Sequence, residues 1–551
     1  MKTLTAGVTF LALTVVCATL AGIALGGLTT ISALPCIILG CTGAIFAARN
    51  VPKPTKCKLG VWDWVMAIVF TLVSLRAFLW ILYPAGDEWL VLSPNNLGDL
   101  SLHITFIRYM ASGVPFWPES PIFAGTPLVY PPGVDLLNSL LVLLSMDLRV
   151  GLILVGLGTS ALTFLALRQW GGSFAVAALL FGGGVIGFDI LRAGALIDYQ
   201  ADGIWKNAFL ALFVTQRGLL YALPAGLLLL SAWRDEFFEG KKTLPHAVQW
   251  LVYATMPLFH VHSFLFLSVV LAAIFVCEPR ARKAAVTLVG LAFIPATLLV
   301  FLVTGGFSAA SGIRWVPDWM LETGNWVALL KDIGVAPVLG LIALGLAFRH
   351  KDREGITFLG VAVVVFAICC VVAFSQWPWD NTKLMLWSWL VCAPYLCRFI
   401  LRPLPSPAQC AICVLLFFTG AVSLVAGLDG RHGYAIAKRS ELAAWEVALR
   451  DVPADATFAA IPTFNHPLLL LGHKMLCGYD GHLYSHGIKY QDRYQRLQRL
   501  MQKPPGWEKG LLQLGATHAA FRANENPTGE LQIIDLKAAS AGEITPSPSN
   551  Q

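Results

Sequence analysis

The chain has 551 residues, of which 57% are hydrophobic and only 13% are charged. Soluble domains are about 25% charged, so this composition excludes an ordinary soluble protein and indicates one embedded in a membrane. The net charge is +7, but the basic residues are spread over short loops. That distribution indicates orientation in a membrane, with membrane lipid as a partner, and no binding to nucleic acid.

Apolar runs of about 20 residues, enough to cross about 30 Å of hydrocarbon, recur from the N-terminus to residue 428. The first run is longer than the apolar core of a signal peptide, so we expect a retained helix. Asp147 and Arg149 interrupt a later run, which predicts a short re-entrant helix before a full span. The expected fold is all-α and polytopic, with about 13 transmembrane helices. The expected spans are 4–28, 29–48, 61–83, 134–168, 173–190, 218–233, a tight pair across 247–277, 284–303, 327–348, 355–374, 384–401 and 410–428.

The connections between these spans fall into two sets that alternate along the chain. One set carries sixteen Lys and Arg residues, and the other carries six. Short cytoplasmic loops are enriched in Lys and Arg. We therefore expect an integral plasma-membrane protein with a cytoplasmic N-terminus and with residues 84–133 and the C-terminal region on the extracytoplasmic side. The basic residues of the poorer set are Arg108, Arg192, Lys206, Arg217, Arg314 and Lys383.

The composition changes after residue 428, which ends the predicted transmembrane domain, residues 1–428. Beyond it, "ELAAWEVAL" and "YQDRYQRLQRLM" have apolar residues at helical spacing, and "TFAAI" and "THAAF" are typical of short strands. We expect residues 429–535 to form a small extracytoplasmic α/β domain and residues 536–551 to form a disordered tail. The 12 cysteines lie mostly in apolar runs and predict neither a disulfide framework nor a thiolate metal site.

Polar residues gather in the first external loop, residues 84–133. Asp87 and Glu88 directly follow a predicted span, and a plain solvated loop is one interpretation of this pair. Asp99 and His103 are four residues apart, so they share one face of a helix. A structural alternative for Asp99 is the N-cap of a helix over the residues that follow it.

Arg108 adds a cation to this loop, and six prolines between residues 115 and 132 then return the chain to the membrane as a rigid, irregular segment.

The motif "GDLSLHITFIRYMASGVPFWP" resembles the first-loop pattern of oligosaccharyltransferase catalytic subunits and related bacterial proteins of the GT-C superfamily of membrane glycosyltransferases. The layout of many consecutive spans, a long acidic first loop and an external C-terminal domain is similar to that superfamily too. The resemblance implies transfer of a sugar from a polyprenyl-phosphate carrier, with Asp99 as the catalytic or metal-binding carboxylate. The Asp87–Glu88 pair instead resembles the acidic pair of protein O-mannosyltransferases, so the two matches compete for the catalytic role.

A second motif, "SQWPWDNTKLMLW", places Asp380 and Lys383 between tryptophans at the start of a span. Charged residues beside a span are costly unless they have partners, so one interpretation is an ion pair between the two. The other is that the Lys383 ammonium binds a lipid phosphate while the tryptophans occupy the headgroup layer.

Three further residues lie at the predicted outer ends of spans. In "FHVHS", His260 and His262 would point to opposite sides of a helix, so a joint metal site requires a turn there; buried structural histidines are the alternative. Arg217, in "QRGLLYALP", suits bidentate binding of a phosphate or serves as an interfacial anchor.

In the C-terminal region, "GYDGHLYSHGIKYQDRY" is a polar loop that either closes over the membrane site, where it can bind an acceptor, or connects elements of the small domain.

These features favour a glycosyltransferase that moves a sugar from a polyprenyl-phosphate-linked donor to an acceptor on the extracytoplasmic face. A loop carboxylate would deprotonate the acceptor, and cationic groups or a divalent cation, Mg²⁺ or Mn²⁺, would stabilise the leaving phosphate. The alternatives are a transporter or flippase of lipid-linked saccharides, which needs ionisable residues at mid-membrane depth, and a non-catalytic scaffold of the same fold.

Overall fold

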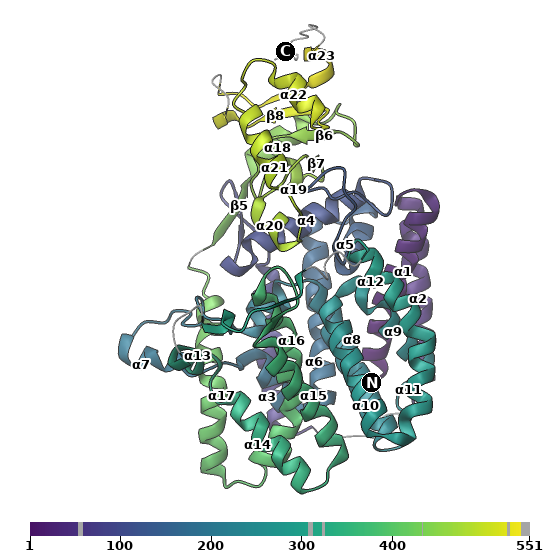
Figure 1. Cartoon of the computed structure of the whole chain (residues 1–551), viewed down its shortest axis with the longest axis vertical. Coiled ribbons are helices and arrows are strands. Elements are labelled where there is room, and N and C mark those ends of the chain that lie inside the picture. The colour runs from purple at the N-terminus through teal and green to yellow at the C-terminus, as the bar shows by residue number, and fades with distance from the viewer. Residues whose placement is uncertain (53–58, 307–311, 322–325, 432, 526–528, 541–551) are drawn as a thin grey trace.

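The computed structural model describes residues 1–52, 59–306, 312–321, 326–431, 433–525 and 529–540. A bundle of long helices forms most of the molecule, and a small domain of strands and short helices lies above it (Figure 1). The N-terminus lies in the lower half of the bundle, and α23 (Leu536–Ser540), the last helix of the described chain, lies at the far end of the small domain.

Two N-terminal helices, α1 (Lys2–Leu25) and α2 (Thr30–Asn50), pack side by side. Gly40 permits this close approach, because a Cβ atom there would lie 2.0 Å from Thr14 Oγ1. Small residues allow this kind of backbone contact between helices in lipid. The first apolar run is therefore a helix that packs in the bundle, and α3 (Val61–Leu79) follows α2.

The segment after α3 forms the upper end of the bundle. Strands β1 (Tyr83–Ala85) and β2 (Glu88–Val91) make a hairpin, and β2 also pairs with β5 (Tyr434–Lys438). The 3-10 helix η1 (Pro94–Asn96) leads into α4 (Leu97–Ala111), which lies directly below the small domain (Figure 1). These strands tie the first loop to the C-terminal region.

The next long helix starts where the charge interruption predicts. The short helix α5 (Gly133–Leu143) precedes α6 (Leu148–Phe181), and the Asp147 carboxylate caps α6 by accepting a hydrogen bond from the backbone of Val150. Inside α6 the chain turns at Gly171 and Gly172, of which Gly172 has φ 65°, a conformation that glycine adopts without a steric cost.

The expected span 173–190 is wrong as a continuous helix, because helical structure ends at Phe181. Residues 182–208 are mostly irregular and contain only η2 (Ile186–Asp189) and α7 (Ile190–Ala193). Irregular backbone at membrane depth needs protein partners. This segment finds them, since the backbone amide of Gly183 donates to Leu416 O and that of Val185 to Lys331 O.

The rest of the bundle consists of helices and one short hairpin. The hairpin is formed by β3 (Arg314–Trp315) and β4 (Val372–Ala373). The remaining helices are the π-helix η3 (Phe209–Val214), α8 (Gly218–Phe237), α9 (His246–Phe259), α10 (Val261–Cys277), η4 (Pro279–Ala281), α11 (Arg282–Leu288), η5 (Val289–Phe293), α12 (Ile294–Val303), η7 (Trp319–Leu321), α13 (Trp326–Ile333), α14 (Ala336–Arg349), α15 (Arg353–Cys369), η8 (Pro378–Asn381), α16 (Thr382–Leu396), η9 (Cys397–Leu401) and α17 (Ser406–Gly427).

Within the described ranges, seven helices are long and apolar enough to cross a membrane, accompanied by three shorter apolar helices. The expected number of about 13 spans is therefore not reached by full-length helices. Residues 327–348, expected as one span, are divided between α13 and α14 at Gly334, which has φ 72°. The chain is an integral membrane protein with a mostly helical fold, and its bundle mixes full spans with shorter helices.

Three basic residues expected on the same side of the membrane form ion pairs with other segments of the bundle. Arg353 pairs with Glu278, Arg398 with Asp352, and Arg168 with Asp63. Each ion pair joins segments that are far apart in the sequence. The side of the membrane that each end of the bundle faces stays a prediction.

The small domain contains a four-stranded sheet in the order β7-β6-β8-β9. Its strands are β6 (Thr457–Ala459), β7 (Lys474–Met475), β8 (His518–Phe521) and β9 (Gln532–Asp535). The short helices beside it are α18 (Arg439–Ala448), α19 (Pro467–Leu470), α20 (Asp480–Ser485), α21 (Gln491–Leu500), α22 (Trp507–Gln513), η10 (Ala523–Glu525) and α23 (Leu536–Ser540).

The core of the domain has Trp445 and Phe458 almost fully buried. The predicted strands and helices of this region are present, but α23 occupies part of the segment expected to be disordered; residues 541–551 lie outside the described residues.

The predicted topology can be tested with single thiols at the two ends of the molecule. Cys477 is fully buried and burial raises the pKa of its thiol to about 12, so it is a poor target. A thiol introduced at the exposed position 489 of the small domain, by the substitution Lys489→Cys, is a better target. A membrane-impermeant maleimide should label Lys489→Cys in intact cells and leave the exposed Cys277 at the other end unlabelled until the cells are opened. The reverse pattern would contradict the predicted orientation.

Candidate functional site

Asp99 lies in the first turn of α4, below the small domain. It does not cap the helix, because the N-cap residue is Asn96 and no side chain there makes a capping bond. Its side chain is partly exposed, and its one described hydrogen bond is a long one, 3.5 Å from Gln216 Nε2. Removal from bulk water raises the pKa of the Asp99 carboxyl, although the nearby charges of His103 and Lys383 act in the opposite direction.

One helical turn further along α4, His103 joins a buried chain of charged groups. His103 Nδ1 lies 2.7 Å from Asp135 Oδ2, and Arg217 Nε donates to Asp135 Oδ1 at 3.1 Å. The side chains of all three are at most 3% exposed. The short helix α5 thus supplies Asp135, and the start of α8 supplies Arg217. One carboxylate holds both an imidazole and a guanidinium in fixed positions.

Arg217 is only partly satisfied by this pairing. Among the described residues, Nη1 and Nη2 of its guanidinium have no hydrogen-bond partner although both atoms are buried. Leaving buried charged donors unpaired is costly. Two such donors on one planar group have the geometry that fits the oxygens of a phosphate or carboxylate.

Lys383 and Asp380 form the ion pair that their spacing predicts, with Lys383 Nζ 2.8 Å from Asp380 Oδ1. Asp380 also accepts a hydrogen bond from Ser375 Oγ. The pair is mostly buried, and it lies close enough to Asp99 for its two charges to affect the pKa of the Asp99 carboxyl. The start of α16 therefore brings a cation to the same region as α4.

The turn between α9 and α10 lies beside this pair. His260 has extended backbone and its Nδ1 accepts a hydrogen bond from the backbone of Ser263, so it caps α10. The rings of His260 and His262 are 5.6 Å apart. The Nε2 atom of His260 is buried and has no partner among the described residues. The predicted turn is present, and His260 has at least a structural role.

Aromatic and imidazole side chains cover the site from above. Tyr130 stacks on His486 of the small domain, with ring centroids 5.3 Å apart, and makes an edge contact with His103. His482 lies against the first turn of α4, near Gly98. Burial lowers the pKa of His482 to about 4 and that of His486 to about 3. Both are therefore neutral near pH 7. The contacts of His482 and His486 place the C-terminal loop over the cluster around Asp99.

The other predicted carboxylates lie elsewhere. Asp87 is bound by the backbone and hydroxyl of Ser440 at the junction of β2 with the small domain, and its neighbour Glu88 is exposed on β2. Ser440 lowers the pKa of Asp87 by hydrogen bonding. The Arg108 side chain is on the last turns of α4, about 13 Å along the helix from Asp99 at 1.5 Å per residue. The structure thus separates these three residues from the cluster around Asp99.

Few of the described side chains around Asp99 are free to hold a metal ion. No group of three or more His, Cys, Asp or Glu side chains that could hold a metal ion occurs in the part of the chain that the structure describes. Asp135 and Asp380 are already engaged by Arg217 and Lys383. These donors do not by themselves form a Mg²⁺ or Mn²⁺ site, so the cation stays a prediction from the resemblance, with Asp99 as the carboxylate left for it.

Sequence reasoning missed Asp135, Tyr130 and Gln216. Asp135 lies in the apolar stretch "GVDLLNSLLVL", where an acidic residue in the first helical turn is unremarkable. A carboxylate on the apolar side of a membrane helix is nevertheless expensive, and that cost was the available signal.

No family model matches the chain, and no curated protein matches it. A solved structure that is similar to it is the archaeal oligosaccharyltransferase AglB from Archaeoglobus fulgidus, in complex with an inhibitory peptide and a dolichol-phosphate. The match covers 86% of this chain and 74% of that chain, with a TM-score of 0.49 and 12% sequence identity.

Proposed function

We propose that the chain is a membrane transferase that moves a sugar from a lipid-phosphate donor to an acceptor hydroxyl at the end of the bundle covered by the small domain. The observation that carries this proposal is the Arg217 guanidinium, whose two terminal nitrogens are buried and unpaired within the described chain. It lies at the mouth of a helix bundle, where the phosphate of a membrane-anchored donor would be found. Lys383 provides a second cation nearby.

In this reaction Asp99 is the base. It accepts the proton of the acceptor hydroxyl, the hydroxyl oxygen attacks the anomeric carbon, and the bond from that carbon to the phosphate oxygen breaks. The electron pair of that bond stays on the phosphate, where Arg217 and Lys383 stabilise the added negative charge. The raised pKa of Asp99 suits a base that works near neutral pH.

A second candidate, a transporter or flippase of lipid-linked saccharides, is favoured by the irregular segment 182–208. Broken helices at membrane depth are typical of transporter binding sites. That segment is, however, fixed to α13 and α17 by backbone hydrogen bonds, whereas the unpaired Arg217 nitrogens lie in the cluster around Asp99. Release of a free lipid phosphate together with a glycosylated acceptor supports the transferase. Movement of an unaltered donor across vesicles would support the transporter.

Variants of Lys383 can distinguish a role in donor binding from a structural role in the ion pair with Asp380. Lys383→Gln should weaken use of the lipid donor by about tenfold, because a charge-assisted contact contributes about 1.5–3 kcal/mol. The double variant Lys383→Gln/Asp380→Asn removes the buried pair as a whole and should remain equally weak. Donor dependence of transfer by the purified protein in lipid nanodiscs measures both.

A matched control is Arg192→Gln, at the same end of the bundle but 85% exposed, which should transfer at the parent rate. Full recovery in the double variant would contradict donor binding by Lys383 and leave it as the ion-pair partner of Asp380.

A further inference from the structure

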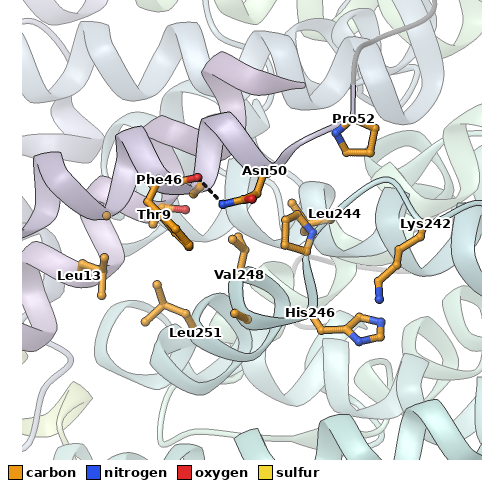
Figure 2. A pocket seen from close by; sticks show the side chains of 14 residues that line it. Thr9, Leu13, Phe46, Asn50, Pro52, Lys242, Leu244, His246, Val248 and Leu251 are labelled. Carbon is orange, nitrogen blue, oxygen red and sulfur yellow. Dashed lines mark hydrogen bonds between the residues drawn. The ribbon is translucent and has the colours of Figure 1, made fainter.

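A separate cavity lies at the end of the bundle away from the small domain. It is lined by residues of α1, the end of α2 and the start of α9, and its volume is about 530 Å³ (Figure 2). None of the residues around Asp99 lines it. It is therefore independent of the proposed transfer reaction.

The cavity has a polar side and an apolar side. Lys242 and His246 lie together on one side, and Leu13, Phe46 and Leu251 lie toward the other (Figure 2). The apolar side is open to the surroundings of the bundle, since the Phe46 side chain is 70% exposed. A ligand that fills both sides must carry a polar head and an apolar chain.

The polar side chains of the cavity differ in whether they have hydrogen-bond or ion-pair partners. His246 Nε2 lies 2.6 Å from Glu236 Oε1, and the Asn50 amide donates to Phe46 O at 2.9 Å. Lys242, in contrast, has no ion pair or hydrogen bond with any described residue. Its neighbour Lys241 is paired with Glu239 at 2.8 Å and does not line the cavity. One ammonium group at the cavity is thus left to attract an anion.

We propose that this cavity binds an anionic glycerophospholipid, with the phosphate at Lys242 and an acyl chain along Leu13, Phe46 and Leu251. The position favours this occupant, because the cavity opens at the end of helices that cross the membrane, where headgroups meet the hydrocarbon layer. The basic residues gathered at this end raise the local concentration of anionic lipid. A soluble anion would leave the apolar wall in contact with water. The bound lipid would hold the α8–α9 connection against α1 and α2.

The test uses the purified full-length protein in detergent. Binding of phosphatidylglycerol and of phosphatidylcholine is compared by native mass spectrometry and by the shift of the thermal unfolding midpoint. We expect phosphatidylglycerol to bind the parent protein more tightly. Lys242→Gln should weaken that binding about fivefold, as one basic residue near an anionic lipid contributes about 1 kcal/mol. Lys241→Gln, the matched loss of charge outside the cavity, should bind like the parent.

A second variant guards against an effect of surface charge alone. Ala247→Trp starts from an exposed residue that lines the cavity, and it should block phosphatidylglycerol while leaving the unfolding midpoint without lipid unchanged. Glycerol phosphate should give no shift. Equal weakening by Lys241→Gln and Lys242→Gln, equal affinity for both lipids, or a full shift with glycerol phosphate would each overturn the proposal.

Discussion

Asp99→Asn should lower the rate of sugar transfer by about a hundredfold or more while the protein remains folded, because general-base catalysis contributes about that much. The change keeps the size of the side chain and its one long contact with Gln216, but it removes the group that accepts the proton. Transfer by the parent should rise with pH through a pKa above the ordinary carboxyl value, since the ionised form is the active one. His482 and His486, with pKa values of about 4 and 3, are already neutral near pH 7 and do not change charge there.

The same exchange should act on stability in the opposite direction. A carboxyl whose pKa is raised in the fold contributes stability that is fully present below its unfolded pKa and is lost as pH rises through the folded pKa. The ionised Asp99 carboxylate therefore lowers the free energy of unfolding of the protein. We expect Asp99→Asn to unfold at the same or a higher temperature than the parent. A capping role would instead make the variant less stable.

Asp87→Asn and Glu88→Gln are the matched controls, because both remove a carboxylate from the same loop. Asp87 holds the junction with the small domain through Ser440, so its variant should lose some stability and keep most activity. Glu88→Gln should change neither. A hundredfold loss at either position, with Asp99→Asn fully active, would move the base to that pair and contradict the assignment to Asp99.

The predicted grouping of the loops rests on an additive signal. Sixteen basic residues against six is a pattern that no single loop determines. The irregular segment 182–208 was not predictable, because its composition is apolar and apolar residues alone indicate a span. What keeps it irregular is a set of backbone partners at Leu416 and Lys331, which are distant in the sequence.

The candidate site also contains a part that the sequence predicts and a part that it does not. Asp99 with His103, and Asp380 with Lys383, were recognisable because each pair is local, at a spacing that fixes its geometry. Asp135 gains its meaning only from Arg217, 82 positions later, and from His103, 32 positions earlier. The closing loop with His486 comes from the far end of the chain. Contacts between residues so far apart in the sequence depend on the whole fold, and no characteristic sequence spacing predicts them.

Arg217 is the side chain whose replacement should affect donor use most strongly. Arg217→Lys keeps a cation beside Asp135 but removes the two terminal nitrogens that are left unpaired in the described chain. Two charge-assisted contacts of about 1.5–3 kcal/mol each correspond to a loss of about a hundredfold or more in kcat/KM for the lipid donor. The acceptor dependence should not change, because the acceptor meets Asp99. Initial rates over a matrix of donor and acceptor concentrations measure both effects.

The structural role of Arg217 needs its own variant, since breaking a buried ion pair costs about 3–5 kcal/mol of stability. Arg217→Gln/Asp135→Asn removes both charges and should recover most of the stability that Arg217→Gln alone loses, as measured by thermal unfolding. Donor use should nevertheless stay as low as in Arg217→Lys, because neither variant offers a planar pair of donors to a phosphate. If Arg217→Lys instead transferred sugar at the parent rate, the guanidinium would be a partner of Asp135 only. The phosphate would then have to be held by Lys383.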